Sequence, residues 1–359
     1  MGRCAVGQGL YLVGSVPFET TSDVFKTIGS EFGTRIGQIP DGEVGERIDW
    51  ITHLETLFRD NPSFEPSGET FAVHGNSKRR ERYRLRAGVK ASDVKFGDLG
   101  YRKHALASYA AFKQQKAVGH VPASTRFQVD LVPAHSVLWL FVVESEQRAL
   151  DPVYNAHVIA EMNEILAAIP HEELSIQFDI ASAVFARLER NEANVYGANR
   201  AEMVETFASI IAPLANKVPA DVPLLFHFCY GDANHKHAIE PTDMNDMVLI
   251  ANALAQKITR RINLIHMPVP RERTDEAYFR PLNTLSLKPE TDLYLGLIHY
   301  TDGLNGTKTR IDVARRFVPR FGIATECGFG RRDPKTIPAL LKLHLAAHDY
   351  LINIGEQRP

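Results

Sequence analysis

The segment Val222-Pro-Leu-Leu-Phe-His-Phe-Cys-Tyr-Gly231 carries the clearest signals in this chain of 359 residues. Its short apolar run predicts a buried strand. Side chains two residues apart on a strand share a face, so His227 and Cys229 are expected to point the same way. An imidazole and a thiol side by side at a strand end supply half of a tetrahedral zinc site. Two ordinary core residues would give the same pattern, so the interpretation depends on what other strands contribute.

Seven further apolar segments predict strands, and most alternate with helical patterns. The other strands are expected at residues 9–17, 35–40, 125–132, 174–179, 261–266, 293–298 and 321–325. Helices are expected at 21–32, 46–59, 101–118, 151–169, from 182, and at 199–217, 242–258 and 336–354. Alternation of this kind implies a parallel sheet with right-handed crossovers. Eight units in this length favour an α/β fold of the closed (β/α)8 TIM-barrel type over an open doubly wound sheet. The sequence also lacks the glycine-rich fingerprints of nucleotide-binding open sheets.

A single barrel domain is expected over residues 1–359, with an insertion at about 61–100 after the second βα unit. In that stretch the strand and helix patterns give way to Pro, Gly and charged residues, including Lys78-Arg79-Arg80-Glu81-Arg82. A basic run of this kind usually forms a solvated face. The alternative interpretation is a basic grip on an anionic part of a substrate.

Composition limits the classes of partner. The formal net charge of −2 gives no reason to expect nucleic acid or an anionic membrane surface. No apolar run approaches the roughly 20 residues needed to cross a bilayer, and the first residues do not resemble a signal peptide. The three cysteines, Cys4, Cys229 and Cys327, are too sparse for a disulfide framework. We therefore expect a cytoplasmic protein whose partner is a small molecule.

Polar residues interrupt the predicted strands mainly at their carboxyl ends, which meet at one mouth in a barrel. They are Ser15, Asp41, Glu43, Asp179, His227, Cys229, His266, His299, Glu326 and Cys327. Two imidazoles and two thiols among them, His227, Cys229, His266 and Cys327, would satisfy tetrahedral zinc. Alternatively, three of the four bind zinc and one position stays open for a substrate thiol or for water. The competing interpretation makes Cys327 a buried apolar residue and His266 a hydrogen-bonded one.

Six short motifs, in order, resemble the cobalamin-independent methionine synthase superfamily, which also contains the uroporphyrinogen decarboxylases. They are Val13-Gly-Ser-Val-Pro17, Asp41-Gly-Glu43, the spacing from Pro133 to Trp139, Ile176-Gln-Phe-Asp179, His227-Phe-Cys-Tyr230 and Glu326-Cys-Gly328. The resemblance is to the C-terminal catalytic barrel of that superfamily, in a single-barrel form. It extends over most of the chain.

The resemblance implies roles for individual residues. Ser15, Glu43 and Asp179 would bind an amino-acid substrate, and Trp139 would line a folate pocket. His227, Cys229 and Cys327 would hold zinc, and His299 would correspond to the catalytic histidine that protonates the leaving group. A thiol such as homocysteine would be the acceptor.

The chain also departs from the superfamily pattern. His266 stands where the superfamily usually has a glutamate ligand, so a zinc site here would carry one negative charge less. Asp179 is followed by Ile180-Ala-Ser182, and Phe185 occupies the place of an acidic residue for the pterin. A folate-type donor is therefore less strongly implied than zinc.

Three functions remain as hypotheses. The first is a zinc-dependent methyl or alkyl transferase with a thiol acceptor, in which His299, Asp179 and Glu43 are catalytic. The second is a metal-dependent lyase or hydrolase that acts on a small polar substrate at the same barrel mouth. The third is a binding or structural protein built on a degenerate barrel. The oligomeric state is not predicted.

Overall fold

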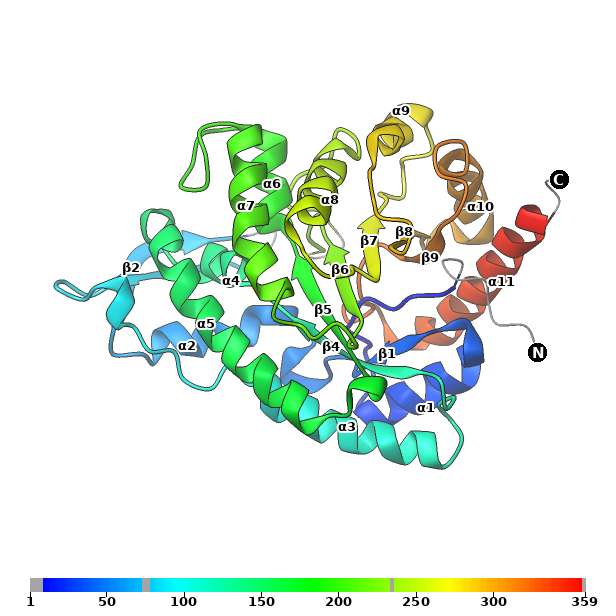
Figure 1. The fold of residues 1–359 in the computed structure, drawn as a ribbon, viewed down its shortest axis with the longest axis horizontal. Coiled ribbons are helices and arrows are strands. Elements are labelled where there is room, and N and C mark those ends of the chain that lie inside the picture. The colour runs from blue at the N-terminus through cyan, green and yellow to red at the C-terminus, as the bar shows by residue number, and fades with distance from the viewer. Residues whose placement is uncertain (1–8, 73–77, 233–235, 357–359) are drawn as a thin grey trace.

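Seven parallel strands form a curled sheet in the computed structural model, which describes residues 9–72, 78–232 and 236–356 (Figure 1). The sheet order is β1-β4-β5-β6-β7-β8-β9, and all six strand pairs are parallel. The strands are β1 (Gln38–Pro40), β4 (Arg126–Leu131), β5 (Leu174–Ile180), β6 (Leu224–Phe228), β7 (Leu264–Pro268), β8 (Asp292–Ile298) and β9 (Gly322–Thr325). The predicted α/β class with a parallel sheet is thus confirmed.

Helices connect successive strands and cover the outside of the sheet (Figure 1). They are α1 (Thr21–Phe32), α2 (Thr56–Arg59), α3 (Tyr101–Ala117), α4 (Ala134–Phe141), α5 (Glu144–Ala168), α6 (Ser182–Arg190), α7 (Arg200–Ala215), α8 (Asn245–Lys257), α9 (Glu276–Phe279), α10 (Gly303–Ala314) and α11 (Ile337–Glu356). The central strands are covered on both faces, which is why every residue of β5, β6 and β7 is buried and their sequences read as continuous apolar runs. No helix among the described residues is long and apolar enough to cross a membrane.

The eighth strand position is occupied by bridges rather than by a regular strand. Leu10 forms parallel bridges to Ile36, just before β1, and to Ile323 in β9. The Leu10 amide donates to the Arg35 carbonyl at 2.8 Å, and the Tyr11 amide donates to the Ile323 carbonyl at 3.2 Å. The predicted strand at 9–17 therefore reaches both edges of the sheet through isolated bridges at its start.

A two-stranded antiparallel hairpin lies within the stretch where an insertion is expected. It consists of β2 (Phe64–Phe71) and β3 (Arg80–Leu85) and is separate from the main sheet. A parallel bridge from Tyr83 to Val142 connects it to the segment after α4. The hairpin brings Phe71 and Arg80 to the carboxyl end of the main sheet, where they line a cavity.

Two local expectations are wrong. The single helix expected at 46–59 is broken into 3-10 turns and the short α2, because Gly45 and Trp50 both have positive φ (+70° and +58°). The helix α5 begins at Glu144, with Glu144 and Glu146 in its first turn, so Pro152 lies inside the helix instead of at its start. Cys4 lies outside the described residues.

Candidate metal centre and active-site cavity

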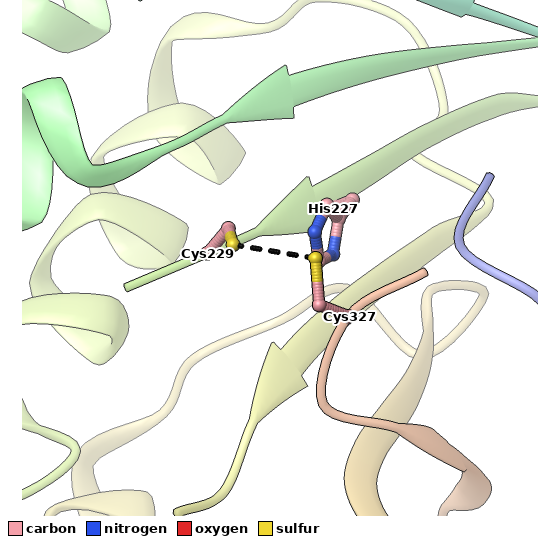
Figure 2. A group of neighbouring side chains, drawn as sticks. All are labelled: His227, Cys229 and Cys327. Atoms are coloured by element: carbon pink, nitrogen blue, oxygen red, sulfur yellow. Dashed lines mark hydrogen bonds between the residues drawn. The ribbon is translucent and has the colours of Figure 1, made fainter. Parts of the chain in front are cut away.

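Three of the predicted metal-binding side chains meet at the carboxyl end of the sheet (Figure 2). His227 is on β6, and Cys229 follows that strand with its amide donating to the Ile180 carbonyl at 2.9 Å. Cys327 comes from the turn after β9, where the Thr325 hydroxyl donates to the Cys327 carbonyl at 2.8 Å. One potential ligand atom from each of the three residues lies within 4.8 Å of the other two.

The spacing of the two sulfur atoms fits zinc. Cys229 Sγ and Cys327 Sγ are 3.7 Å apart. Two thiolates bound to one zinc ion at about 2.3 Å with a tetrahedral angle would lie about 3.8 Å apart. His227 and Cys229 are 2% and 8% exposed, so these two donors are already withdrawn from water, whereas Cys327 is partly exposed. The donor set and its geometry therefore fit a zinc ion held by one imidazole and two thiolates, with a fourth position open.

The backbone after β6 also supports this site. The Gly231 amide donates to Cys229 Sγ at 3.3 Å, a contact that stabilises a thiolate. Gly231 has φ +94°, and a Cβ atom there would lie 3.2 Å from the Ala238 nitrogen. This turn therefore favours glycine. The hydrogen bond between the two thiols, together with burial, raises the pKa of Cys327 well above its usual range.

His266 does not belong to this group of three. Its Nδ1 lies 2.8 Å from His227 Nδ1, and its Nε2 lies 3.1 Å from the Thr325 carbonyl. Both ring nitrogens of His266 are therefore engaged, one by His227 and one by the backbone of β9. Burial lowers the pKa of His266 to about 3, and burial with the neighbouring His266 lowers the pKa of His227 well below its usual range. The sequence predicts that His266 lies on the strand after the one that carries His227. It does not show whether the His266 ring binds metal or is hydrogen-bonded to His227.

The thiols and His227 open onto a cavity of about 490 Å³. Predicted substrate-binding residues line it together with residues that sequence analysis missed. The predicted ones are Ser15, Glu43, Asp179 and Trp139, and the others include Trp50, Phe71, Arg80 and Arg331. The four predicted residues thus line one cavity, although they come from four different segments.

Ser15 holds the turn that carries Cys327. Its carbonyl accepts from the Phe329 amide at 2.6 Å, and its hydroxyl accepts from the Gly330 amide at 3.2 Å. A Cβ atom at Gly328 would lie only 2.4 Å from the Ser15 hydroxyl, so this close approach requires glycine. Ser15 thus lines the cavity and also positions the segment that contains Cys327.

Asp179 at the end of β5 is buried and fully hydrogen-bonded. Its Oδ1 accepts from Gln177 Nε2 at 2.7 Å, and its Oδ2 accepts from the Trp50 indole at 3.0 Å. Burial raises the pKa of Asp179 to about 7, although both hydrogen bonds oppose the shift. A carboxyl group with this pKa can gain or lose a proton near neutrality.

Glu43 adopts an unusual backbone conformation at the cavity wall. Its φ is +47°, and its amide donates to Asp41 Oδ1 at 2.8 Å, which helps to hold this conformation. Asp41 itself is satisfied by Arg47 and Ser108 and lies in the turn that supports Glu43. Burial, followed by repulsion from Asp179 and Asp41, raises the pKa of Glu43 to about 8. A strained non-glycine residue at a cavity is typical of functional sites.

Asp130 is a third carboxylate that sequence analysis missed. It lies near the end of β4, and its Oδ1 accepts from Gln128 Nε2 at 2.9 Å. Burial and repulsion from Asp179 and Glu43 raise its pKa well above the usual range. A Cβ atom at Gly14 would lie 3.1 Å from Asp130 Oδ2 and 3.4 Å from Glu43 Oε2. The two carboxylates therefore both lie against Gly14.

Trp139 lies on α4, where its ring faces the hairpin. The rings of Phe71 and Trp139 meet edge-on with centroids 4.8 Å apart. Arg82 donates to the Trp139 carbonyl at 2.9 Å and also stacks over Phe71 at 4.3 Å. The hairpin and α4 thus form one aromatic wall of the cavity.

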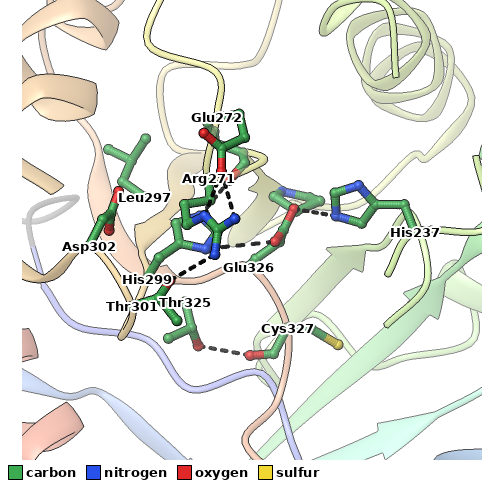
Figure 3. A network of polar contacts seen from close by, with 12 residues as sticks. His237, Arg271, Glu272, Leu297, His299, Thr301, Asp302, Thr325, Glu326 and Cys327 are labelled. Atoms are coloured by element: carbon green, nitrogen blue, oxygen red, sulfur yellow. Dashed lines mark hydrogen bonds and ion pairs between the residues drawn. The ribbon is translucent and has the colours of Figure 1, made fainter. Parts of the chain in front are cut away.

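His299 takes part in a separate network (Figure 3). Its Nε2 donates to the Val269 carbonyl at 2.8 Å, and its Nδ1 lies 3.9 Å from Glu326 Oε2. His237 Nε2 contacts the other oxygen of Glu326 at 2.7 Å. Although burial opposes it, the contacts with Glu326 and Glu240 raise the pKa of His237 to about 10. His299 is not among the described residues that line the cavity.

Comparison with known proteins supports the fold more than the function. No protein-family model matches the chain, and no curated protein matches it. A solved structure from Listeria monocytogenes, provisionally named a vitamin-B12-independent methionine synthase, matches with a TM-score of 0.54 at 15% sequence identity. The match covers 96% of this chain and 98% of the Listeria chain. At this identity the similarity establishes a shared α/β fold over nearly the whole length of both proteins.

Proposed function

We propose that this protein is a zinc-dependent methyl or alkyl transferase with a thiol acceptor. The observation that carries the proposal is the group of His227, Cys229 and Cys327, whose sulfur spacing fits zinc and which opens onto a cavity of about 490 Å³. Catalytic zinc sites keep three protein ligands and one open position, as this group would. The fold shared with the Listeria protein is consistent with this chemistry.

Different residues around the cavity would bind the acceptor and the donor. The zinc ion, when bound, would lower the pKa of an acceptor thiol and make its sulfur a nucleophile at neutral pH. Asp179 would bind an ammonium group of an acceptor such as homocysteine, and Ser15 would fix the wall beside it. Trp139 and Phe71 would pack against a flat part of the donor, of which a folate is one example.

The proton for the leaving group would come from a cavity carboxyl group. The sequence predicts His299 as this donor. However, His299 lies beside Glu326 and is not among the described residues that line the cavity. Glu43, with a pKa raised to about 8, remains largely protonated at neutral pH and lines the cavity. We therefore assign proton donation to Glu43.

The same site supports a second candidate function, a metal-dependent lyase or hydrolase. The observation that favours it is the pair of carboxyl groups, Glu43 and Asp179, whose pKa values are raised to about 8 and 7. Such groups can exchange protons with a small polar substrate while the metal polarises a carbonyl or activates water.

The proposal includes an architecture and a cellular setting. We propose one (β/α)8 barrel over residues 1–359, with the segment at 9–17 in the eighth strand position and an insertion at about 61–100 that carries the hairpin. A cytoplasmic location and a small-molecule partner, expected from composition, belong to the same proposal.

Metal analysis of the purified protein tests the zinc site. We expect about one zinc ion per chain, lost on Cys229→Ser or Cys327→Ser and retained on Cys4→Ser, the matched change at the third cysteine. A protein without bound zinc, whose two site variants are unaltered in activity, would overturn the proposal.

X-ray absorption at the zinc edge distinguishes the two candidate functions. A thiol acceptor that takes the open position should raise the number of sulfur ligands from two to three. A lyase or hydrolase should retain two sulfur ligands in the presence of thiols such as homocysteine.

A further inference from the structure

His227 and His266 face each other across neighbouring strands. They are paired in the register of β6 and β7, and their rings stack with centroids 5.0 Å apart. Their Nδ1 atoms are 2.8 Å apart, and the side chains are 2% and 0% exposed. A nitrogen–nitrogen distance of 2.8 Å requires one proton between the two atoms, carried by one ring and accepted by the other.

The Thr325 carbonyl decides which ring carries that proton. It lies 3.1 Å from His266 Nε2 and can only accept, so His266 must carry its proton on Nε2. A neutral imidazole has a single N–H group, which leaves a lone pair on His266 Nδ1. His227 must then carry its proton on Nδ1, and its Nε2 keeps the lone pair that a metal ion needs.

The neutral form of His266 fits its surroundings. The ring is fully buried, and Tyr11 packs 5.4 Å from it. No ion pair joins His266 to a carboxylate in the described part of the chain, and a charged imidazolium without such a partner is unfavourable in the interior.

Close packing of the strands around Thr325 accompanies the contact between its carbonyl and His266 Nε2. Gly296 lies on β8, the strand between β7 and β9. A Cβ atom at Gly296 would lie 3.0 Å from the Thr325 carbonyl oxygen and 3.0 Å from Pro268 Cα. Glycine at this position lets the strands approach closely. Thr325 also bonds the Cys327 carbonyl, so one residue serves both His266 and the segment of the third metal-binding side chain.

We propose that His266 is a positioning residue, not a ligand, and that it selects the metal-binding tautomer of His227 by accepting its Nδ1 proton. The inference rests on the proposed metal site and assigns a function to a residue that sequence analysis placed among the ligands. Hydrogen-bond partners behind metal-binding histidines commonly change metal affinity by 10- to 100-fold when removed.

Two substitutions of nearly the same shape isolate the effect. In His266→Asn the side-chain oxygen takes the position of Nδ1 and can accept from His227, whereas in His266→Leu no acceptor remains. We expect zinc affinity, measured by competition with a chelating dye, to stay within about 3-fold for His266→Asn and to fall about 10- to 100-fold for His266→Leu. Equal losses in both variants, as removal of a ligand would produce, would overturn the proposal.

Nitrogen NMR of histidine-labelled protein tests the tautomers without any metal. The metal-free protein should show His227 protonated on Nδ1 and His266 protonated on Nε2. On addition of zinc, the ligation shift should appear at His227 Nε2 alone. A His227 protonated on Nε2, or a ligation shift at His266, would contradict the proposal. If the wild-type protein takes up no zinc, the proposed metal site is wrong. The tautomers of the metal-free protein would still show whether His266 accepts the Nδ1 proton of His227.

Discussion

At the residue scale, Glu43 and Asp130 form a carboxylate pair that lacks a described ion-pair partner. Arg47 pairs with Asp41 at 2.8 Å instead. The two carboxylates lie against Gly14, and burial raises the pKa of both, with repulsion from Asp179 acting on each and repulsion from Glu43 acting on Asp130. Such a cluster is unfavourable for folding when all its members are ionised, and it would be relieved by the positive group of a substrate.

The stability of the metal-free protein should therefore depend on pH through Glu43. Its pKa rises from the usual 4.5 to about 8 in the folded state. Between these values the folded protein holds a proton that the unfolded chain releases, so the free energy of unfolding should fall as pH rises from about 4.5 to 8. Urea unfolding at several pH values should show this fall in the wild type and a flatter profile in Glu43→Gln.

The matched control for this experiment is Glu46→Gln, which makes the same change at an exposed position three residues away. This variant should keep the wild-type profile. If Glu43→Gln also keeps it, Glu43 is ionised in the folded protein at neutral pH, and its assignment as proton donor fails.

A repeated pattern in the sequence marks Asp130. Gln128-Val-Asp130 repeats the pattern of Gln177-Phe-Asp179 on the neighbouring strand, and Asp130 pairs with Gln177 in the register. The two glutamines are hydrogen-bonded to each other at 3.0 Å. His266 differs, because the direction in which its ring nitrogens point depends on Thr325, which is distant in the sequence and contacts it only in the folded protein.

At the scale of elements, strands were easier to predict than the segments between them. The buried strands β5 and β6 have apolar runs that end in polar residues, and Asp179 and His227 lie near the carboxyl ends of these strands, as this pattern predicts. By contrast, all eight residues of α4 are buried, so its sequence has no polar face to distinguish a helix from a strand. The broken segment at 46–59 depends on the positive φ of Trp50, which lets its indole reach Asp179.

The buried charged side chain of Arg310 in α10 connects the segments that follow β7 and β8. Arg310 is fully buried, and its guanidinium contacts Asp302 at 2.6 and 3.0 Å. It also donates to the carbonyls of Leu297 and Arg271 at 2.9 and 2.7 Å. These bonds join the end of β8 to the segment after β7, next to the network of His299 in Figure 3.

Replacement of Arg310 should therefore be strongly destabilising. Arg310→Met would leave two carbonyls and the Asp302 carboxylate without their donors, and we expect a loss of about 3–5 kcal/mol in the free energy of unfolding. Denaturant titration measures this loss. Arg316→Met provides the control, because Arg316 is exposed and forms one surface ion pair with Glu276, worth at most about 1 kcal/mol. Similar losses in the two variants would show that the Arg310 bonds contribute no more than a surface pair.

At the scale of the whole molecule, the site depends on how the sheet closes. The candidate zinc ligands come from β6, the residue after it and the turn after β9, while Glu43 follows β1 at the other edge of the sheet. Ser15 lies between these edges and bonds the turn that contains Cys327. The segment from Leu10 to Ser15 therefore connects the metal-binding side of the cavity to the carboxylate side.

Hydrogen exchange can test whether this segment closes the barrel. The amides of Leu10 and Tyr11 donate to opposite edges of the sheet, at Arg35 and Ile323, and the Ile323 amide donates back to Gly9 at 3.2 Å. In a closed barrel these bonds open only when the sheet itself unfolds, so the amides of Leu10, Tyr11 and Ile323 should be protected as strongly as the amides of β5. Slow exchange in β5 combined with loop-like exchange at Leu10 and Tyr11 would mean that the sheet is open between β1 and β9. Ser15 would then not be held against the Cys327 turn, and the two halves of the proposed site could separate.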